Sequence, residues 1–413
     1  MRKSALLLSI ALFGGMVPAQ GWVRHSDVPL GAINYGISTG SALCSDDTLV
    51  FCLKGHYNEF YSYSPAANVW TRRESLPVVN RLLKKRYAGR GTSLIGSPQG
   101  VFCSKGNLSY DLWRYVPDTT AYPWTQSVDV PLGAKFPGEG SGMAVVDSFL
   151  YLIKGNLTFE FCRFNLNRGF WDVSLPSYPA GPSGKPVGSG GCVTAARGRI
   201  YSLKGDGRVE FYSFDPESLA WRIEPYIPTG PSGRGVGTGG CMTWDGRDTV
   251  YCLKGNFTNE YWAYSLSAGN WTQLPDMPLS LKHVGRGASL AAVGNAIYAL
   301  RGNSTREFWS YTPTSGITGQ PPPALRKLSL TVSPSLARRP VRFDLSPGSR
   351  SARLRVTAPD GRTVRDFGRF SAPAIVYWDG CDELGRPVPA GVYFCAAQGP
   401  AGRTTARLVK LGN

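Results

Sequence analysis

Residues Tyr251 to Trp271 read YCLKGNFTNEYWAYSLSAGNW, and this stretch decides the fold because close copies of it recur along the chain. Each copy has a β-type run, a basic residue followed by glycine, an acid and an aromatic cluster, and five copies add a later tryptophan. The basic residues, spaced 47 to 51 residues apart, are Lys54, Lys105, Lys154, Lys204, Lys254 and Arg301. Repetition at a fixed period predicts units that bury their faces against their neighbours.

Each unit reads as four short strands separated by turns. Five copies carry a G-x-G pair 15 or 16 residues before the glycine of the basic pair, while the first copy keeps only Gly40. No helix follows these pairs, so they are not nucleotide loops; we expect them to let the innermost strand enter a crowded axis. A period near 50 with four strands per unit is typical of a β-propeller.

The pattern resembles the kelch repeat. The run IYxLKG stands where kelch repeats carry an apolar strand ending in Gly-Gly, and an aromatic pair and a spaced tryptophan follow. Here Lys or Arg replaces the first glycine in every copy, so the resemblance is to a divergent kelch-like propeller over residues 20–317. The sixth copy lacks its tryptophan, and the N-terminal segment with Trp22 and Asp27–Leu30 matches the missing strand. We therefore expect an all-β, six-bladed propeller closed by the N-terminal strand, which removes exposed sheet edges.

The N-terminus has the composition of a secretory signal peptide. Arg2 and Lys3 precede a short apolar run, and Val17–Ala19 forms a small-x-small cleavage site. No other apolar stretch approaches the length that a membrane helix needs. We expect residues 1–19 to be a signal peptide, and the protein to be secreted or held at the cell surface without a transmembrane segment.

A small module follows a proline-rich linker at residues 318–325. Residues 326–413 have alternating apolar patterns and turn signals, which predict a small antiparallel sandwich. The segment from Tyr377 to the C-terminus resembles the Ig-like domain of flagellar hook-capping proteins and of C-terminal sorting domains in type IX secretion. The matching positions are Trp378–Gly380, Gly385–Pro389, Gly391–Phe394 and the closing basic strand. The resemblance implies secretion or surface attachment through outer-membrane machinery; the same fold also occurs as a passive accessory domain.

The formal charge is +17. Charge alone permits nucleic acid as a partner, but export argues against it and favours an anionic glycan or surface. In four-stranded up-and-down sheets, the strand 2–3 turns and the strand 4–1 loops share one face. Candidate binding residues on these loops are Arg81, Lys84, Lys85, Arg86, Lys135, Lys185, Arg234, Lys282, His283 and Arg286.

The repeated basic residues have two interpretations. They could form a cation ring for a glycan, or each could pair with an acid five or six residues later and fix the turn of its own sheet. We favour the structural role; the acids are Glu59, Asp111, Glu160, Glu210, Glu260 and Glu307. Glycosylation sequons occur at Asn107, Asn156, Asn256 and Asn303. A polar turn, in which each asparagine bonds its own backbone, explains their place in the repeat better.

The nine cysteines fit an oxidising compartment, although an odd number leaves at least one unpaired. Cys241 and Cys252 flank a hairpin turn, and Cys381 and Cys395 are the natural C-terminal pair, so these four are the disulfide candidates. We interpret most of the others as buried thiols. Neither the cysteines nor the three histidines have metal-ligand spacing, so we expect no metal and no cofactor.

Enzymatic motifs are weak. Gly36–Gly40 matches G-x-S-x-G by chance, because a loop and a strand surround it rather than a strand–turn–helix. The first hypothesis is therefore a binding protein for a glycan or a protein ligand. The alternatives are a sugar-modifying enzyme resembling the sialic-acid epimerases on exported kelch-type propellers, with Arg286 and His283 as candidates, and a structural surface protein without a ligand.

Overall fold

The structure is a computed structural model, and it describes residues 21–32, 34–46, 48–117, 122–313, 329–334, 336–337, 340–346, 352–370, 374–399 and 402–411. All regular elements in these ranges are β-strands. None of the described residues forms a helix that could cross a bilayer. The predicted signal peptide and the predicted linker lie outside the described residues.

Five four-stranded antiparallel sheets follow one another in chain order. The first two consist of β2 (Ala42–Ser45), β3 (Val50–Lys54), β4 (Glu59–Ser64) and β5 (Val69–Arg73), then β6 (Ser93–Ser97), β7 (Gly100–Ser104), β8 (Leu112–Tyr115) and β9 (Trp124–Gln126). The third consists of β10 (Gly142–Val146), β11 (Phe149–Ile153), β12 (Phe161–Asn165) and β13 (Phe170–Asp172). The fourth consists of β14 (Cys192–Ala196), β15 (Arg199–Leu203), β16 (Phe211–Asp215) and β17 (Ala220–Glu224). The fifth consists of β18 (Cys241–Trp244), β19 (Thr249–Leu253), β20 (Tyr261–Ser265) and β21 (Asn270–Leu274).

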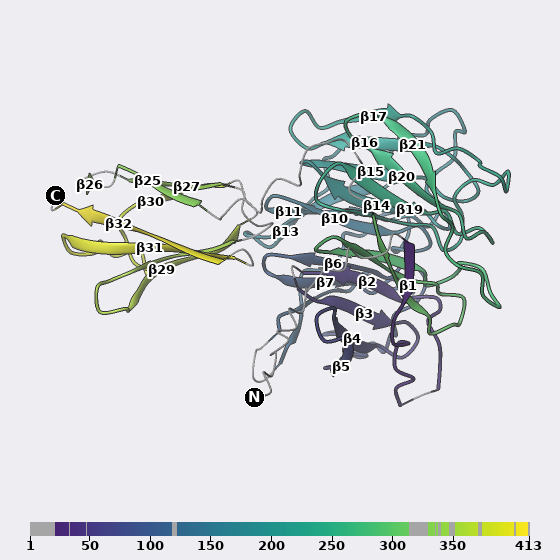
Figure 1. Cartoon of the computed structure of the whole chain (residues 1–413), viewed down its shortest axis with the longest axis horizontal. Coiled ribbons are helices and arrows are strands. Elements are labelled where there is room, and N and C mark those ends of the chain that lie inside the picture. The colour runs from purple at the N-terminus through teal and green to yellow at the C-terminus, as the bar shows by residue number, and fades with distance from the viewer. Residues whose placement is uncertain are drawn as a thin grey trace, which may run out of the picture.

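A further four-stranded sheet combines the two ends of this region. Its strands are β22 (Ser289–Val293), β23 (Ala296–Leu300), β24 (Phe308–Thr312) and the N-terminal β1 (Gly21–Arg24), which pairs with β24. Figure 1 labels β1. Trp22 of β1 donates its indole N–H to the Pro275 carbonyl at 2.9 Å. The fourth-strand tryptophans Trp70, Trp124, Trp171, Trp221 and Trp271 donate in the same way to the strand exit of the preceding sheet. Trp22 thus occupies the position that the sixth repeat lacks.

Aromatic rings fill the space between neighbouring sheets. Phe60 of β4 packs against Trp124 of the next sheet at 5.1 Å between ring centroids, and Phe211 packs likewise against Trp271 at 5.0 Å. The second strands are almost wholly buried, which explains their continuous apolar runs, whereas the fourth strands are largely exposed. The sheets therefore share their cores in pairs, as stacked repeats require.

The first strands contact one another in sequence, β2 to β6, β10, β14, β18 and β22, and β22 contacts β2. The G-x-G glycines explain how they approach so closely. A Cβ atom at Gly239 would lie 2.6 Å from the Gly285 carbonyl oxygen of the next sheet, and one at Gly40 would lie 2.6 Å from Gly89. Equivalent backbone contacts involve Gly91 with Gly138, Gly140 with Gly188, Gly190 with Gly237, and Gly287 with Ser38. The arrangement is β-propeller-like.

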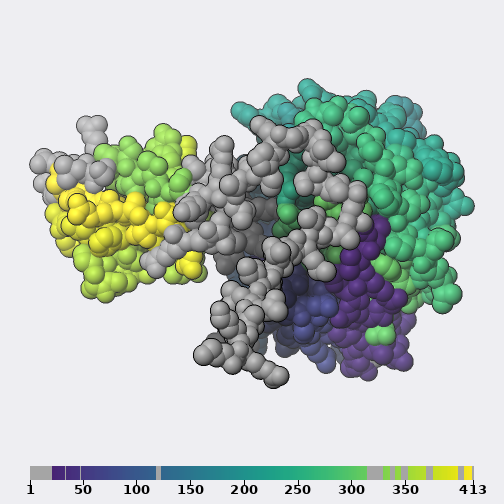
Figure 2. Space-filling view, in the orientation of Figure 1, coloured from purple at the N-terminus to yellow at the C-terminus, as the bar shows by residue number. Residues whose placement is uncertain are grey.

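The C-terminal residues form two more sheets, which gather in a lobe of their own (Figure 2). One consists of β25 (Ser329–Ser333), β27 (Val341–Ser346) and β30 (Ala374–Trp378). The other consists of β26 (Leu336–Ala337), β32 (Gly402–Lys410), β31 (Gly391–Gly399), β28 (Ala352–Thr357) and β29 (Thr363–Phe370). Their shared core includes Phe343, Leu354, Trp378, Cys395 and Leu408.

The two expected disulfides are corrected by the structure, in which all nine cysteines are free thiols. In the β18–β19 hairpin Cys241 pairs with Leu253, and Cys252 pairs with Met242. The two cysteines are therefore one register position apart and face opposite sides of the sheet, where they join different core clusters. Cys395 is buried in the C-terminal core, whereas Cys381 lies in the turn after β30.

The close contact of the first strands gives a matched test. Gly239 and Gly233 both have positive φ, +89° and +66°, but a Cβ atom at Gly233 would meet nothing within 4 Å. Gly233→Ala should lower the free energy of unfolding by about 1 kcal/mol through backbone strain alone. Gly239→Ala should cost about 1–3 kcal/mol more because of the added clash. Urea unfolding followed by tryptophan fluorescence measures both, and equal losses would contradict the packing argument.

Candidate functional site: the loop face and its axial mouth

The repeated cations and acids pair within each sheet. The cation side chains are 0–2% exposed, although they are charged. Nitrogen–oxygen distances are 3.1 Å for Lys54–Glu59, 3.3 Å for Lys105–Asp111, 3.4 Å for Lys154–Glu160, 3.1 Å for Lys204–Glu210, 2.7 Å for Lys254–Glu260 and 2.6 Å for Arg301–Glu307. Side chains this deeply buried cannot form a cation ring that is open to a ligand.

These pairs also hold the loop that arrives from the preceding sheet. Lys254 donates to the carbonyls of Pro228 and Thr229 at 3.1 and 2.7 Å, and Glu260 accepts from the Ser232 amide at 2.8 Å. The Lys254 ammonium lies 5.5 Å from the centre of the Trp262 ring, whose N–H donates to Glu260. We call such a cation, its acid and the loop carbonyls that the cation binds a loop clamp. Lys54, Lys105, Lys204 and Arg301 bind loop carbonyls in the same manner.

Burial and pairing set the pKa values in the clamps. Burial alone would raise the pKa of Glu210, but hydrogen bonds from Ser183, Lys204 and Tyr212 outweigh it and lower that pKa. Burial would likewise raise the pKa of Glu260, but hydrogen bonds from Lys254 and Ser232 lower it. For Glu307, hydrogen bonds from Ser280 and Arg301 outweigh burial and lower the pKa. Burial also lowers the pKa of the Lys204 ammonium. The carboxylates therefore remain ionised at neutral pH.

The four sequon asparagines lie in left-handed turns between the second and third strands, with φ of 51–54°. The sequence suggested that each side chain bonds its own backbone, but the structure shows other acceptors for the amide nitrogens. Each amide nitrogen donates to a carbonyl of the strand 4–1 loop: Asn107 to Tyr87, Asn156 to Phe136, Asn256 to Gly235 and Asn303 to His283. The nitrogen that a glycan would occupy is thus already used in holding this loop.

Three of the predicted binding cations hold these same turns. Lys135 donates to the Asn156 carbonyl at 3.2 Å, Arg234 to Asn256 at 2.9 Å and Lys282 to Asn303 at 3.0 Å. These hydrogen bonds join the strand 4–1 loops to the strand 2–3 turns, so both lie on one face of the sheets. We call this face the loop face.

The other predicted residues have different surroundings on the loop face. Arg81 pairs with Asp129 at 2.9 Å. Lys84, Lys85 and Arg86 follow it in a small exposed hairpin, in which the backbones of Lys85 and Val79 form an isolated antiparallel β-bridge. Lys185 and His283 are exposed. Arg286 lies apart from all of these, beside the axis.

The middle residues of the G-x-G segments line a cavity of about 140 Å³ at the axis, which we call the axial mouth. They are Arg90, Glu139, Ser189, Thr238 and Arg286, from the loops before five of the first strands, and Thr39, which precedes Gly40 in the first copy, takes the sixth place. Arg90 pairs with Glu139 at 3.4 Å, and the Ser189 and Thr238 hydroxyls bond each other at 2.9 Å. Among the described residues, Arg286 has no hydrogen-bond or ion-pair partner for its exposed guanidinium.

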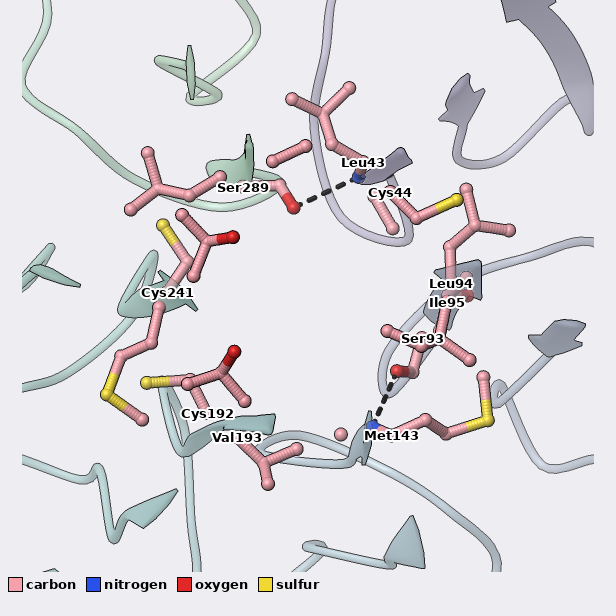
Figure 3. A pocket seen from close by; sticks show the side chains of 18 of the residues that line it. Leu43, Cys44, Ser93, Leu94, Ile95, Met143, Cys192, Val193, Cys241 and Ser289 are labelled. Atoms are coloured by element: carbon pink, nitrogen blue, oxygen red, sulfur yellow. Dashed lines mark hydrogen bonds between the residues drawn. The ribbon is translucent and has the colours of Figure 1, made fainter. Parts of the chain in front are cut away.

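A second cavity of about 230 Å³ adjoins the axial mouth, since Ser41, Thr92, Ser141, Gly191, Gly240 and Ala288 line both. Figure 3 shows the first strands around this cavity, with mixed apolar side chains and hydroxyls on its wall. Ser289 bonds the Leu43 amide and Ser93 bonds the Met143 amide, each at 3.0 Å, so these hydroxyls join neighbouring strands. The inner cavity is thus uncharged, and the charged groups gather at the axial mouth.

Of the residues that line the axial mouth, sequence reasoning had named only Arg286, as a candidate binding residue on a strand 4–1 loop. Arg90, Glu139, Thr39, Ser189 and Thr238 were missed, although a signal was present: the glycines around them recur, while the middle residue changes from copy to copy. The histidines do not converge there. His25 lies between Tyr63 and Ser310, and burial lowers its pKa. No group of three or more metal-ligating side chains occurs among the described residues.

Comparisons with known proteins add little to this description. No family model and no curated protein matches the chain. Among solved structures it is similar to that of YjhT, with 11% identity and a TM-score of 0.49 over 70% of this chain and 95% of that one. It is also similar to a protein of unknown function from Bacteroides thetaiotaomicron, with 12% identity and a TM-score of 0.47 over 71% of this chain and 76% of that one. The propeller-like fold rests on the sheet order described above.

Breaking one clamp should destabilise the protein strongly. Lys204→Met leaves Glu210 buried without its cation, so the free energy of unfolding should fall by about 3–5 kcal/mol. Lys204→Met with Glu210→Leu should lose less, because no charge is left unpaired. Arg222→Met, on the exposed strand β17 of the same sheet, is the control and should change stability by about 0.5 kcal/mol at most. A Lys204→Met loss no larger than the control would overturn the clamp's structural role.

The clamps also predict acid sensitivity. The folded-state pKa values of Glu210, Glu260 and Glu307 are lowered from 4.5, so the folded chain binds fewer protons than the unfolded chain in acid. Their stabilisation is present above about pH 5 and is lost as the pH falls through the folded pKa values. Urea unfolding at several pH values should show a steep fall below about pH 4, and Glu210→Gln should make it shallower. Glu217→Gln, in an exposed turn, is the control; an unchanged slope in Glu210→Gln would contradict this account.

Proposed function

We propose that the chain is an exported binding protein whose six four-stranded sheets form one six-bladed, kelch-like propeller closed by the N-terminal strand. The pairing of β1 with β24, the contact of β22 with β2 and the common position of Trp22 support this architecture. The departure from kelch is the replacement of a glycine by the clamp cation.

We further propose that residues 326–413 are an Ig-like sorting domain that directs secretion or surface attachment through outer-membrane machinery. The two sheets around one core support the fold part of this proposal. Trp378, from the segment that carries the resemblance, is buried there and donates to the Cys381 carbonyl at 2.8 Å. The signal-peptide pattern supports export to the compartment in which such a domain acts.

The proposed ligand is a carboxylated sugar or a glycan that carries one, bound at the axial mouth. The observation that carries this proposal is the exposed guanidinium of Arg286, without a partner among the described residues, beside the hydroxyls of Thr39 and Thr238. A guanidinium binds a carboxylate through two parallel hydrogen bonds, and hydroxyls bind the sugar's own hydroxyls. Arg90 is already neutralised by Glu139, so Arg286 would be the anion-selecting group.

A sugar-modifying enzyme is the second candidate, favoured by the Glu139 carboxylate, which lies at the axial mouth with its side chain 39% exposed. A carboxylate beside a bound sugar could act as a general base. Turnover would distinguish this activity from binding alone. A protein ligand and a purely structural surface protein are the remaining alternatives.

A glycan array probed with the chain lacking its first 19 residues, at low and high salt, tests the proposal. We expect binding to acidic glycans that weakens with salt and falls about tenfold to a hundredfold in Arg286→Glu. Arg222→Glu, on the outer strand β17, should bind like the unchanged protein. Glycans that bind are then incubated with the protein, and new products would favour the enzyme. A blank array, or binding indifferent to Arg286→Glu, would sink the axial proposal.

A further inference from the structure

The loop face carries large apolar side chains that are mostly exposed. Leu82 and Leu83 in the β5–β6 loop are 63% and 84% exposed, and Leu279 and Leu281 in the β21–β22 loop are 87% and 103% exposed. Leu132 in the β9–β10 loop is 80% exposed, and Phe257 in the β19–β20 turn is 70% exposed. We call these six residues the apolar rim. Single exposed leucines are ordinary, but their recurrence on one face at the tips of separate loops indicates a contact surface.

Cations stand next to the apolar rim. Lys84, Lys85 and Arg86 directly follow Leu83, and among the described residues none of the three has an ion-pair partner. Arg234 lies 5.9 Å from the centre of the Phe257 ring. The acids Asp129 and Glu139 on this face are already paired with Arg81 and Arg90. The face therefore combines exposed apolar tips with an excess of positive charge.

We propose that the loop face docks onto an anionic lipid surface. Leucines inserted at the boundary between headgroups and acyl chains, with cations held at the headgroups, are the usual means by which a soluble protein binds such a surface. The tips belong to different loops around the axis rather than to one patch. A fluid, planar surface accepts tips arranged in this way, whereas a protein partner would need a separate pocket for each. Charge complementarity selects an anionic surface over a neutral one.

This proposal uses residues other than those of the axial mouth. Docking would place the axial mouth against the lipid headgroups, but the rim does not require a ligand at the mouth. Either proposal can fail without the other, and Arg286→Glu separates them because Arg286 is not in the apolar rim.

Co-sedimentation with vesicles tests the docking surface, using vesicles of phosphatidylcholine alone and vesicles with about one-third phosphatidylglycerol. We expect binding to the anionic vesicles only. Leu279→Ser with Leu281→Ser should weaken it at least about tenfold, and Lys84→Glu with Lys85→Glu and Arg86→Glu at least about a hundredfold. Tyr122→Ser is the matched control, because Tyr122 is 82% exposed in the β8–β9 loop on the opposite face. All these positions are exposed loop residues, and circular dichroism verifies that each variant is folded.

Arg286→Glu should lower vesicle binding far less than the triple charge reversal. Binding that is lost in high salt but is indifferent to the leucine substitutions would overturn the proposal, because the contact would then be purely electrostatic. Absence of binding to anionic vesicles would also overturn it and would shift the loop face to an acidic protein or polysaccharide. Equal losses in Tyr122→Ser and in the leucine variant would overturn the assignment of the apolar rim.

Discussion

The arrangement of the sheets depends on a charge buried at the end of each second strand. A lysine removed from water is costly unless its ammonium is fully bonded, and each one here has an acid, and in most sheets loop carbonyls, around it. Because those carbonyls belong to the loop from the preceding sheet, the interaction that neutralises the charge also fixes how two sheets meet. The same loops carry the residues of the loop face, so the positions of the axial mouth and of the apolar rim follow from the clamps.

Much of the architecture could be predicted because it repeats. The spacing between Lys204 and Glu210 indicated a hairpin ion pair, and the structure places the two side chains 3.1 Å apart. The likeness of the segment around Trp22 to the segment around Trp271 indicated that the two tryptophans have equivalent places, which their hydrogen bonds to Pro275 and Pro225 share. Repetition gives several observations of one environment, so chance features of a single copy are averaged out.

The rest could not be predicted because it depends on contacts between copies. Arg90, Glu139 and Arg286 are far apart in the sequence and meet only where the first strands converge on the axis. The second role of Lys254, which holds the Pro228 and Thr229 carbonyls, likewise has no local pattern. The Cys241–Cys252 disulfide was wrong because the hairpin register differs by one residue from the one assumed, and a shift of one residue moves a side chain to the other face.

The place of β1 has a consequence for biosynthesis. Trp22 leaves the ribosome early, but the Pro275 carbonyl that receives its indole hydrogen bond lies 253 residues later. At roughly 5–20 residues per second, that interval is on the order of ten to fifty seconds. For that time the first segment has no neighbour to pair with, and β24 adds its own open edge when it is made. The sheets in between can form as they emerge, whereas the last one forms only when the two ends of the region meet. This pairing joins segments far apart in the sequence, so it is expected to be among the last contacts to form.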